Sequence, residues 1–574
     1  MPLPGWVKSR NFAGQHSMAN IVHMNFQRFF KLPGLRRLAA WVAFCTLPAA
    51  MTAQSEATVA IFSINDFHGA FIADGRKDIP GAAALWQTLD SLKEVYPYHI
   101  TVAAGDNFGG SYFYQATRGT LLPVLFDGLD IHISAIGNHE FDDGQTALAA
   151  KWADSPLRPK NWKLDYVCAN VRDASGKVPS FAQPFAIQPI HLKGNKTLNV
   201  AFVGLLTSTT PLQTSASKVK GLAFDGRYDR VLDSIKRIPE FASVRSAQIR
   251  LLLTHIGTKM ENGIPVWDDP NGACLQQLND TTWHGILSAH SHQPVCGNIG
   301  KSNYPVVQGK WHGNYISILK IRVDTLTMKV TGITPELCPV REKGRLSQGA
   351  ARFQAQIDSV LQHATTAGGT PLGKELTCSP ADIIHERTDK WRQTAMGELV
   401  CEAYAEAYRK AAGLDAGTPI IGISHFGSIR AGFNKGKVTV LDVGEALPFA
   451  NALRVYKLTG KQLRSLIDFG LHNQQYGWLQ TGWLQTASKK DGHVTSLYYT
   501  GQNGKRLSLA DDKDCFIVTD EFITTGGDGY LPELFPSRQE IRVGHLPKTT
   551  DAFIQYLDQF EVLPVERLRE YETR

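Results

Sequence analysis

The run Val59-Ala60-Ile61-Phe62-Ser63-Ile64 predicts a buried strand, because it is short, apolar and rich in β-branched residues. It stops at Asn65-Asp66-Phe67-His68-Gly69, which places an aspartate and a histidine two residues apart directly after the strand. Polar residues at this position lie at the carboxyl end of a strand, where α/β proteins bind their ligands. A functional site is therefore expected at this end of the strand.

Similar apolar runs recur along the chain, separated by polar or helical segments. Residues 82–92 have the pattern of a helix, and residues 100–104, 131–136, 198–203 and 249–254 have that of strands. Strands that alternate with helices predict a layered α/β domain with its site at the strand ends.

Acidic, amide and imidazole side chains follow almost all of these predicted strands. A single such residue is most often a cap or a hydrogen-bonded core residue, but five successive positions in one domain predict a metal site. The segments are D-x-H at 66–68, G-D-N at 105–107, G-N-H-E at 137–140, T-H at 254–255 and H-S-H at 290–292.

The donor types in these segments indicate which ions to expect. Two carboxylates, one amide oxygen and four imidazoles, without a thiolate, suit Zn, Mn, Co or Fe better than Mg or Ca. Two ions about 3.5–4 Å apart need a shared anionic ligand, and a carboxylate such as Asp106 can bridge them. We therefore expect two divalent metal ions as cofactors.

In their order and spacing, these segments resemble the motif series of the calcineurin-like metallophosphoesterases over residues 57–335. The resemblance implies an α/β fold in which this domain has four layers, α/β/β/α. It also implies a ligand set for each metal. These are Asp66, His68 and His292 for the first metal, Asn138, His255 and His290 for the second, and Asp106 as the bridge.

The same resemblance implies the catalytic residues. His139 would stabilise the phosphoryl oxygens or protonate the leaving oxygen, and Asp142 would orient His139 and keep it protonated. A hydroxide activated by the metals would attack phosphorus in line. Three other histidines match no motif and are expected to be structural: His132, His284 and His312.

A helical pattern around residues 345–364 is followed by Ala367-Gly368-Gly369-Thr370-Pro371, which marks a domain boundary. We therefore expect the following domains: a metallophosphoesterase domain at 55–340, a linker helix at 341–371, an α/β substrate-binding domain at 372–545 and a helical tail at 546–574.

The second half contains side chains suited to a nucleotide, because aromatic faces stack on a base and an acid accepts hydrogen bonds from ribose hydroxyls. G-x-I-R at 427–430, L-P-F at 447–449 and G-G-D-G-Y at 526–530 resemble, in this order, the C-terminal domain of secreted 5'-nucleotidases. That resemblance implies roles for four residues. Phe449 and Phe522 would enclose the base, Asp528 would hold the ribose, and Arg430 would contact the polar end of the substrate.

The chain departs from the family pattern in this half. His425 and Ser428 replace an Asn and a Gly beside Arg430. An upstream basic segment supplies two more candidate substrate-binding residues, Lys390 and Arg392, but Lys390 stands where Arg is common and Ala395 where Asn is expected. Lysine lacks the planar two-pronged grip of arginine, so these changes bear on substrate choice.

The N-terminus has the three parts of a secretory signal: basic residues, a short apolar run at 38–47 and small residues near 48–53. We expect cleavage near Thr52–Gln54, without a membrane anchor, and export to the periplasm or the medium. Seven cysteines would remain, and Cys274 with Cys296 is the first pair to test for a disulfide. The net charge would fall from +7 to +1, which gives no support to a nucleic-acid polymer as partner.

These expectations combine into an exported phosphohydrolase that releases phosphate from nucleoside 5'-monophosphates. UDP-sugars, 2',3'-cyclic nucleotides or a non-nucleotide ester such as a sulfur-oxidation intermediate are alternative substrates for the same core. A binding protein that has lost catalysis but still binds nucleotides is the alternative of a different class. The complete set of predicted metal ligands favours an enzyme.

Overall fold

The computed structural model describes residues 56–565 and Leu568, apart from 75–77, 110, 151, 154, 342–343, 387–388, 474–475, 489–490 and 501–504. The predicted signal segment at 1–53 therefore lies outside the described residues. Among the residues that are described, no helix has both the length and the apolar character needed to cross a bilayer.

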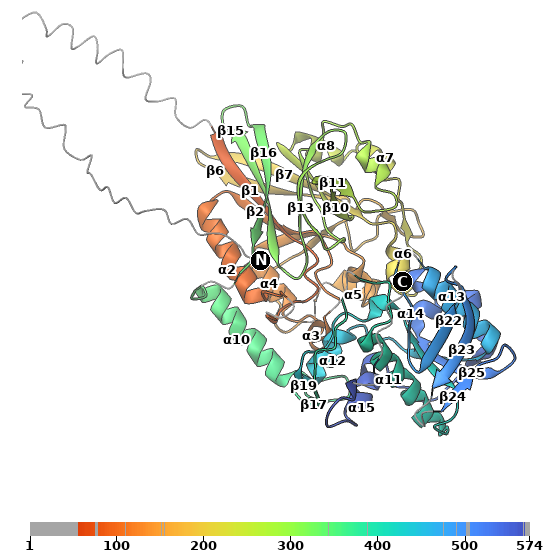
Figure 1. Ribbon diagram of the computed structural model, residues 1–574. Helices are drawn as coiled ribbons and strands as arrows, with labels where there is room; N and C mark the ends of the chain where they lie inside the picture. The colour runs from red at the N-terminus through yellow and green to blue at the C-terminus, as the bar shows by residue number, and fades with distance from the viewer. Residues whose placement is uncertain are drawn as a thin grey trace, which may run out of the picture. The chain divides into compact units, whose positions relative to one another are not determined.

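Two six-stranded sheets form the first half of the described chain (Figure 1). In the first sheet, β1 to β4 are parallel and β15 and β16 are antiparallel to each other. Its order is β16 (Lys329–Pro339), β15 (Tyr315–Asp324), β1 (Glu56–Ile64), β2 (His99–Ala103), β3 (Ile131–Ala135) and β4 (Asp165–Val167). The strands expected at 59–64, 100–104 and 131–136 are therefore present as β1, β2 and β3.

The second sheet has a parallel centre with an antiparallel strand at each edge. Its order is β13 (Pro294–Ile299), β14 (Tyr304–Gly309), β12 (Gly285–Leu287), β9 (Ile249–His255), β7 (Lys196–Leu206) and β6 (Phe185–Leu192). The strands expected at 198–203 and 249–254 are β7 and β9.

Alternation along the strands explains why the two sheets pack face to face. Val59 and Ile61 of β1 belong to one buried cluster with Phe202 of β7 and Leu251 of β9, whereas Ala60 and Phe62 point to the opposite face. Helices cover both outer faces. They are α2 (Ala82–Val95) and α4 (Leu122–Gly128) on the first sheet, and α7 (Tyr228–Ile235) and α8 (Phe241–Ser246) on the second. Helix α10 (Gln348–His363) packs against α2 and α4. The predicted α/β/β/α layering is confirmed.

The second half contains a mixed sheet in the order β21 (Gln480–Thr481), β18 (Ile420–Ser424), β25 (Asp514–Asp520), β20 (Leu453–Thr459) and β26 (Glu540–Ile541). Helix α11 (Ala395–Ala412) packs on β18 and on α15 (Thr549–Leu557), which lies in the predicted tail. Strands β18 and β25 are parallel, so their carboxyl ends meet at one edge. This α/β unit lies where the sequence predicts the substrate-binding domain.

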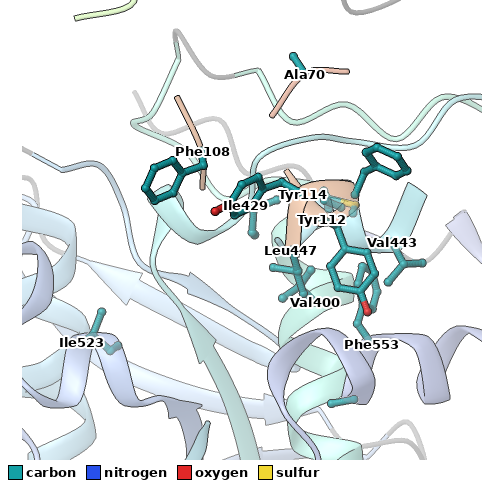
Figure 2. Close-up of a cluster of buried hydrophobic side chains, with 14 of the residues drawn as sticks. Ala70, Phe108, Tyr112, Tyr114, Val400, Ile429, Val443, Leu447, Ile523 and Phe553 are labelled. Carbon is teal, nitrogen blue, oxygen red and sulfur yellow. The ribbon is translucent and has the colours of Figure 1, made fainter. Parts of the chain in front are cut away.

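Apolar contacts join the two halves close to the predicted site. Figure 2 shows Phe108, Tyr112 and Tyr114 of the first half in one buried cluster with Val443 and Leu447 of the second. These tyrosines come from α3 (Tyr112–Thr117), which contacts α12 (Val440–Ala446). This contact between α3 and α12 positions the residues after α12, such as Phe449, beside the strand ends of the first sheet.

Candidate metal centre and substrate cavity

The predicted donor residues gather at the carboxyl ends of strands from both sheets. Because β1, β2 and β3 are adjacent and parallel, the residues after them meet at one edge, and β9 and β12 end opposite that edge. The donors are Asp66 and His68 after β1, Asp106 after β2, Asn138 after β3, His255 at the end of β9, and His290 and His292 after β12.

Four of these residues form a first group whose ligand atoms all lie within 4.8 Å of one another: Asp66, His68, Asp106 and His292. Nε2 of His68 is 3.0 Å from Nε2 of His292. Nε2 of His292 lies 3.4 Å from Oδ1 of Asp66. Side chains from β1, β2 and β12 therefore converge on one point.

Asp106 also belongs to a second group, with His255 and His290. Nε2 of His255 lies 3.2 Å from Oδ2 of Asp106 and 3.2 Å from Nδ1 of His290. Asp106 is the residue common to the two groups, which is the position proposed for a bridging carboxylate.

Two observations fit a metal at these groups. Oδ1 of Asn138 is buried and has no hydrogen-bond partner among the described residues, as expected for an oxygen that binds an ion. Nδ1 of His255 is 2.9 Å from the carbonyl oxygen of Ala104, so that Nδ1 carries a proton and Nε2, which faces Asp106, is the nitrogen left to bind an ion. Imidazole with carboxylate oxygen is a donor set for a divalent transition ion or zinc.

The backbone at the donors has an unusual conformation. Asp66, His68, Asp106, His290 and His292 all have positive φ, between 48° and 79°. Non-glycine residues adopt this left-handed region at a cost of about 1 kcal/mol or more each, and such residues cluster at functional sites. Strand ends that turn sharply in this way aim successive side chains at the same point.

The charges of the donor residues influence one another strongly. Burial alone would raise the pKa of Asp106, but the charges of His255 and His139 outweigh it and hold that pKa well below its usual value. Burial and the neighbouring charge of His255 lower the pKa of His290 to about 3. Burial also keeps the pKa of His68 well below its ordinary value. Burial disfavours a charge on His255, but Asp106 and Asp66 outweigh it and raise the pKa of His255 to about 9. A metal at this group would therefore displace a proton from His255, whereas His68 and His290 are already neutral.

His139 and Asp142 form the predicted pair beside the donors. Nδ1 of His139 is 2.8 Å from Oδ2 of Asp142. Burial opposes a charge on His139, but the carboxylates of Asp142 and Asp106 outweigh it and raise the pKa of His139. This shift favours the protonated imidazole, in which Nε2, the nitrogen that does not face Asp142, would also carry a proton.

Glu140, which lies between these two residues, was not predicted to have a role. Its carboxylate is fully buried and accepts hydrogen bonds from the backbone N–H groups of Asp106, Asn107 and Gly137, at 2.8, 2.9 and 2.5 Å. It thereby fixes the turns after β2 and β3 that carry Asp106 and Asn138. Its place inside the G-N-H-E motif was a signal that could have identified it.

Asn65 and Gln213 are two further supporting residues. The Asn65 amide donates to Oδ2 of Asp66 at 2.7 Å and also accepts from the backbone of Gly309. The amide of Gln213, the last residue of α6 (Thr210–Gln213), is 3.1 Å from Nε2 of His290. Asn65 directly precedes the D-x-H motif, whereas Gln213 lies far from every motif and the sequence gave no signal for it.

One cavity of about 980 Å³ connects the donor groups with residues of the second half. From the first half it is lined by Asp106, Asn138, His139, Asp142, His290 and His292, and from the second half by His425, Arg430, Phe449, Phe522 and Asp528. Some of the predicted metal ligands, both predicted catalytic residues and four of the six predicted substrate-binding residues thus line one space.

Phe449 and Arg430 lie next to the catalytic pair. The rings of His139 and Phe449 are stacked, with centroids 5.8 Å apart, and the Arg430 guanidinium lies 5.5 Å from the Phe449 ring centre. Burial lowers the pKa of Arg430, while Asp106, Asp142 and Asp528 oppose that shift. Arg430 therefore lies between the donor groups and the far end of the cavity.

Phe522 and Asp528 both contact His425, one of the residues that depart from the family pattern. The His425 ring stacks on Phe522 with centroids 4.7 Å apart. Nδ1 of His425 lies 2.7 Å from Oδ2 of Asp528. No role in the site had been assigned to His425.

Other predicted residues lie elsewhere. Lys390 and Arg392 are not among the described residues that line the cavity; Lys390 lies over the Trp391 ring and Arg392 pairs with Asp389. The three histidines that were expected to be structural have local partners. His132 pairs with Asp130, His284 bonds Arg250, and His312 stacks on Trp311. Cys274 and Cys296 are both free thiols in the described chain, so they form no disulfide.

Two known family models match separate parts of the chain. Residues 60–294 match the model for the calcineurin-like phosphoesterases, and residues 375–534 match that for the 5'-nucleotidase C-terminal domain.

Individual relatives are distant. The trifunctional nucleotide phosphoesterase protein YfkN of Bacillus subtilis is 25% identical over 80% of this chain, which spans only 32% of YfkN. An apyrase of Anopheles gambiae is 23% identical, with 82% of this chain and 83% of the apyrase covered. The crystal structure of a 5'-nucleotidase precursor from Thermus thermophilus has the same fold, with a TM-score of 0.67 and 21% identity over 88% of this chain and 99% of that one.

Fold, donor groups and family matches together define a metal-dependent phosphoric ester hydrolase. Within that class, the chain belongs to the 5'-nucleotidase family, in which a calcineurin-like phosphoesterase domain is joined to a 5'-nucleotidase C-terminal domain.

Proposed function

We propose that this chain is an exported hydrolase that releases phosphate from nucleoside 5'-monophosphates and requires two divalent metal ions. The observation that carries the proposal is the shared cavity, in which two donor groups joined by Asp106 open onto Arg430, Phe449, Phe522 and Asp528. A phosphate at the donor groups would leave the rest of a nucleotide facing those residues. Export rests on the signal pattern in the sequence before residue 54.

Asp66, His68 and His292 would hold one ion, Asn138, His255 and His290 the other, and Asp106 both. When bound, two such ions supply an activated water and neutralise charge on the phosphoryl group.

The remaining residues have separate tasks around the reacting phosphate. His139, oriented by Asp142 and with a raised pKa, would use a proton on Nε2 to stabilise a phosphoryl oxygen or to protonate the leaving oxygen. Arg430 contributes a fixed positive charge between the phosphate and the nucleoside. Phe449 stacks on His139, which limits rotation of that ring and offers an aromatic surface to the substrate.

A direct test is phosphate release by the protein, first stripped of metal with a chelator and then reloaded with Mn or Zn. The substrates are AMP, UMP, a 2',3'-cyclic nucleotide and p-nitrophenyl phosphate. We expect metal-dependent release that is fastest with the nucleoside monophosphates. Release from p-nitrophenyl phosphate alone would contradict the nucleotide assignment, and binding of metal and nucleotide without release would indicate a binding protein.

A UDP-sugar is the second candidate substrate, because a cavity of about 980 Å³ is at the upper end of the range for small-molecule sites. Including a UDP-sugar in the same panel separates the two. Faster hydrolysis of the UDP-sugar than of UMP would favour this candidate.

A further inference from the structure

A further cluster of metal-ligating side chains lies in the second half of the chain. It consists of Asp468 and His472 of α13 (Gly460–His472) and of His493, which directly precedes β23 (Val494–Thr500). One ligand atom from each of these residues lies within 4.8 Å of those of the other two. None of these three described residues lines the cavity described above, so the cluster is separate from the candidate active site.

Local structure brings the three side chains together. Asp468 and His472 are four positions apart on one helix, so they lie on the same face of it. Helix α13 packs on β23, and Gly492, with φ of 84°, turns the chain sharply just before His493. The rings of His472 and His493 stack on each other with centroids 4.6 Å apart.

The hydrogen bonds of the two imidazoles favour the same tautomer in each. Nδ1 of His472 is 2.8 Å from the backbone carbonyl oxygen of Asp468, and Nδ1 of His493 is 2.8 Å from Oδ2 of Asp468. Both acceptors place a proton on Nδ1, so the lone pair of the neutral ring is on Nε2. Histidines that bind metals in proteins donate the N–H of their other ring nitrogen to a carbonyl or carboxylate oxygen in this way.

The charges at this cluster favour a bound cation. Burial alone would raise the pKa of Asp468, but hydrogen bonds from the backbone N–H of Val494 and from His493 outweigh it and lower that pKa. Asp468 is therefore ionised at neutral pH. Two positively charged imidazoles stacked at this distance would repel each other, whereas a metal ion can bind two neutral ones.

We propose that Asp468, His472 and His493 form an additional metal site, for zinc or a divalent transition ion such as Cu or Ni. The two imidazoles bind the ion, the carboxylate of Asp468 orients His493 and balances the charge, and water completes the coordination. Imidazole donors favour these ions over Mg and Ca. The side chains of His472 and His493 are 40% and 58% exposed, so an ion reaches them directly from solvent.

An ion at this site would connect the end of α13 to the start of β23. Asn473, the residue after His472, donates a hydrogen bond to the backbone carbonyl of Asp528 at 2.9 Å, and Asp528 lines the cavity. The ion would therefore hold a helix end that itself contacts the cavity wall.

The test is a count of bound ions per chain on the full protein, stripped with a chelator, dialysed against zinc to saturation and measured by atomic spectroscopy. We expect the unmodified chain to hold one ion more than His472→Ala/His493→Ala. His363→Ala is the matched control, because His363 also ends a helix and has Nδ1 2.7 Å from the carbonyl oxygen four residues earlier, that of Ser359. His363 belongs to none of the ligand groups found among the described residues, so this variant should hold as many ions as the unmodified chain.

Asp468→Asn tests the carboxylate. It keeps an oxygen for the backbone N–H of Val494 but removes the charge, so the Kd of the additional ion should rise about 10–100-fold, as for other residues that support a metal ligand. His493→Ala alone should lose the same ion, and it replaces the double variant if thermal unfolding in chelator shows that the latter does not fold.

Equal ion counts in the unmodified chain and the histidine variants would overturn the inference, and so would the same loss in His363→Ala, which would show unspecific binding to surface histidines. The count does not depend on nucleotide hydrolysis, so a failure of the function proposed above would leave this inference standing.

Discussion

His139 contacts both halves of the site, with Asp142 on one side and the ring of Phe449 on the other. It belongs to neither donor group, whereas Asp106 belongs to both. We expect His139→Ala to lose turnover by about 10²–10⁴-fold while keeping its metal, because only proton transfer and charge stabilisation are removed. Asp106→Ala should lose metal and turnover together. Metal content by atomic spectroscopy and phosphate release by assay give the two readouts.

His132→Ala is the matched control, since His132 is a partly exposed histidine that pairs only with groups away from the cavity. It should keep both metal and turnover. Equal loss of metal in the His139 and Asp106 variants would refute the division into a proton-holding residue and a bridging ligand.

The ion pair of His425 with Asp528 predicts a pH-dependent contribution to stability. Because Asp528 and Asp520 raise the pKa of His425 in the folded protein, its protonated form stabilises the fold below the unfolded pKa of about 6.5. That contribution is lost as the pH rises through the folded pKa. The difference in unfolding free energy between the unmodified protein and His425→Phe should therefore be larger at pH 6 than at pH 9. Denaturant titrations at the two pH values measure it, and a difference that grows with pH would contradict the prediction.

At the scale of single elements, β7 contains a glycine at the point where the edge of the other sheet approaches it. A Cβ on Gly204 would lie 2.1 Å from the carbonyl oxygen of Val167 in β4. Gly204→Ala should therefore cost about 1–3 kcal/mol of unfolding free energy, as overpacking does, and lower the melting temperature. Gly373→Ala, where a Cβ has no neighbour within 4 Å, is the control and should change it little.

Sequence patterns predicted the strands, and they predicted which polar residues follow them, because both depend on local features: apolar runs, and polar residues placed directly after them. The first half shows this for β1, β2, β3, β7 and β9. Supporting residues that reach the site from distant segments leave no such pattern. Gln213 contacts His290 across 77 positions of the chain and belongs to a four-residue helix.

At the scale of the whole molecule, the two halves meet through Glu445 of α12. Its Oε1 accepts hydrogen bonds from Oγ of Ser111 and from the backbone N–H of Phe113, at 3.1 and 3.2 Å. We expect Glu445→Ala to raise KM for AMP about 3–10-fold with unchanged metal content, because substrate contacts from both halves must be aligned. Glu445→Gln keeps an acceptor oxygen and should lie closer to the unmodified protein. An unchanged KM in the alanine variant would show that this contact does not align the halves.

The substrate end was harder to predict from sequence than the metal centre, and the reason is long-range packing. Arg430, Phe449, Phe522 and Asp528, for which the motifs predicted substrate-binding roles, all line one cavity. The motifs did not predict that His425 would contact two of these residues, or that Lys390 would lie outside the cavity wall. Those outcomes depend on how β18 and β25 end beside each other, which a single sequence does not encode in any short pattern.

The left-handed backbone of the donor residues implies a trade-off between folding stability and metal-dependent activity. Histidine and aspartate occupy five positions that glycine or asparagine would tolerate at lower cost. Without metal, a variant that replaces a donor should therefore be more stable than the unmodified protein. We expect this for His292→Asn when a chelator is present. All five donor positions therefore carry a folding cost that glycine would avoid, and the three histidines are where that cost is greatest.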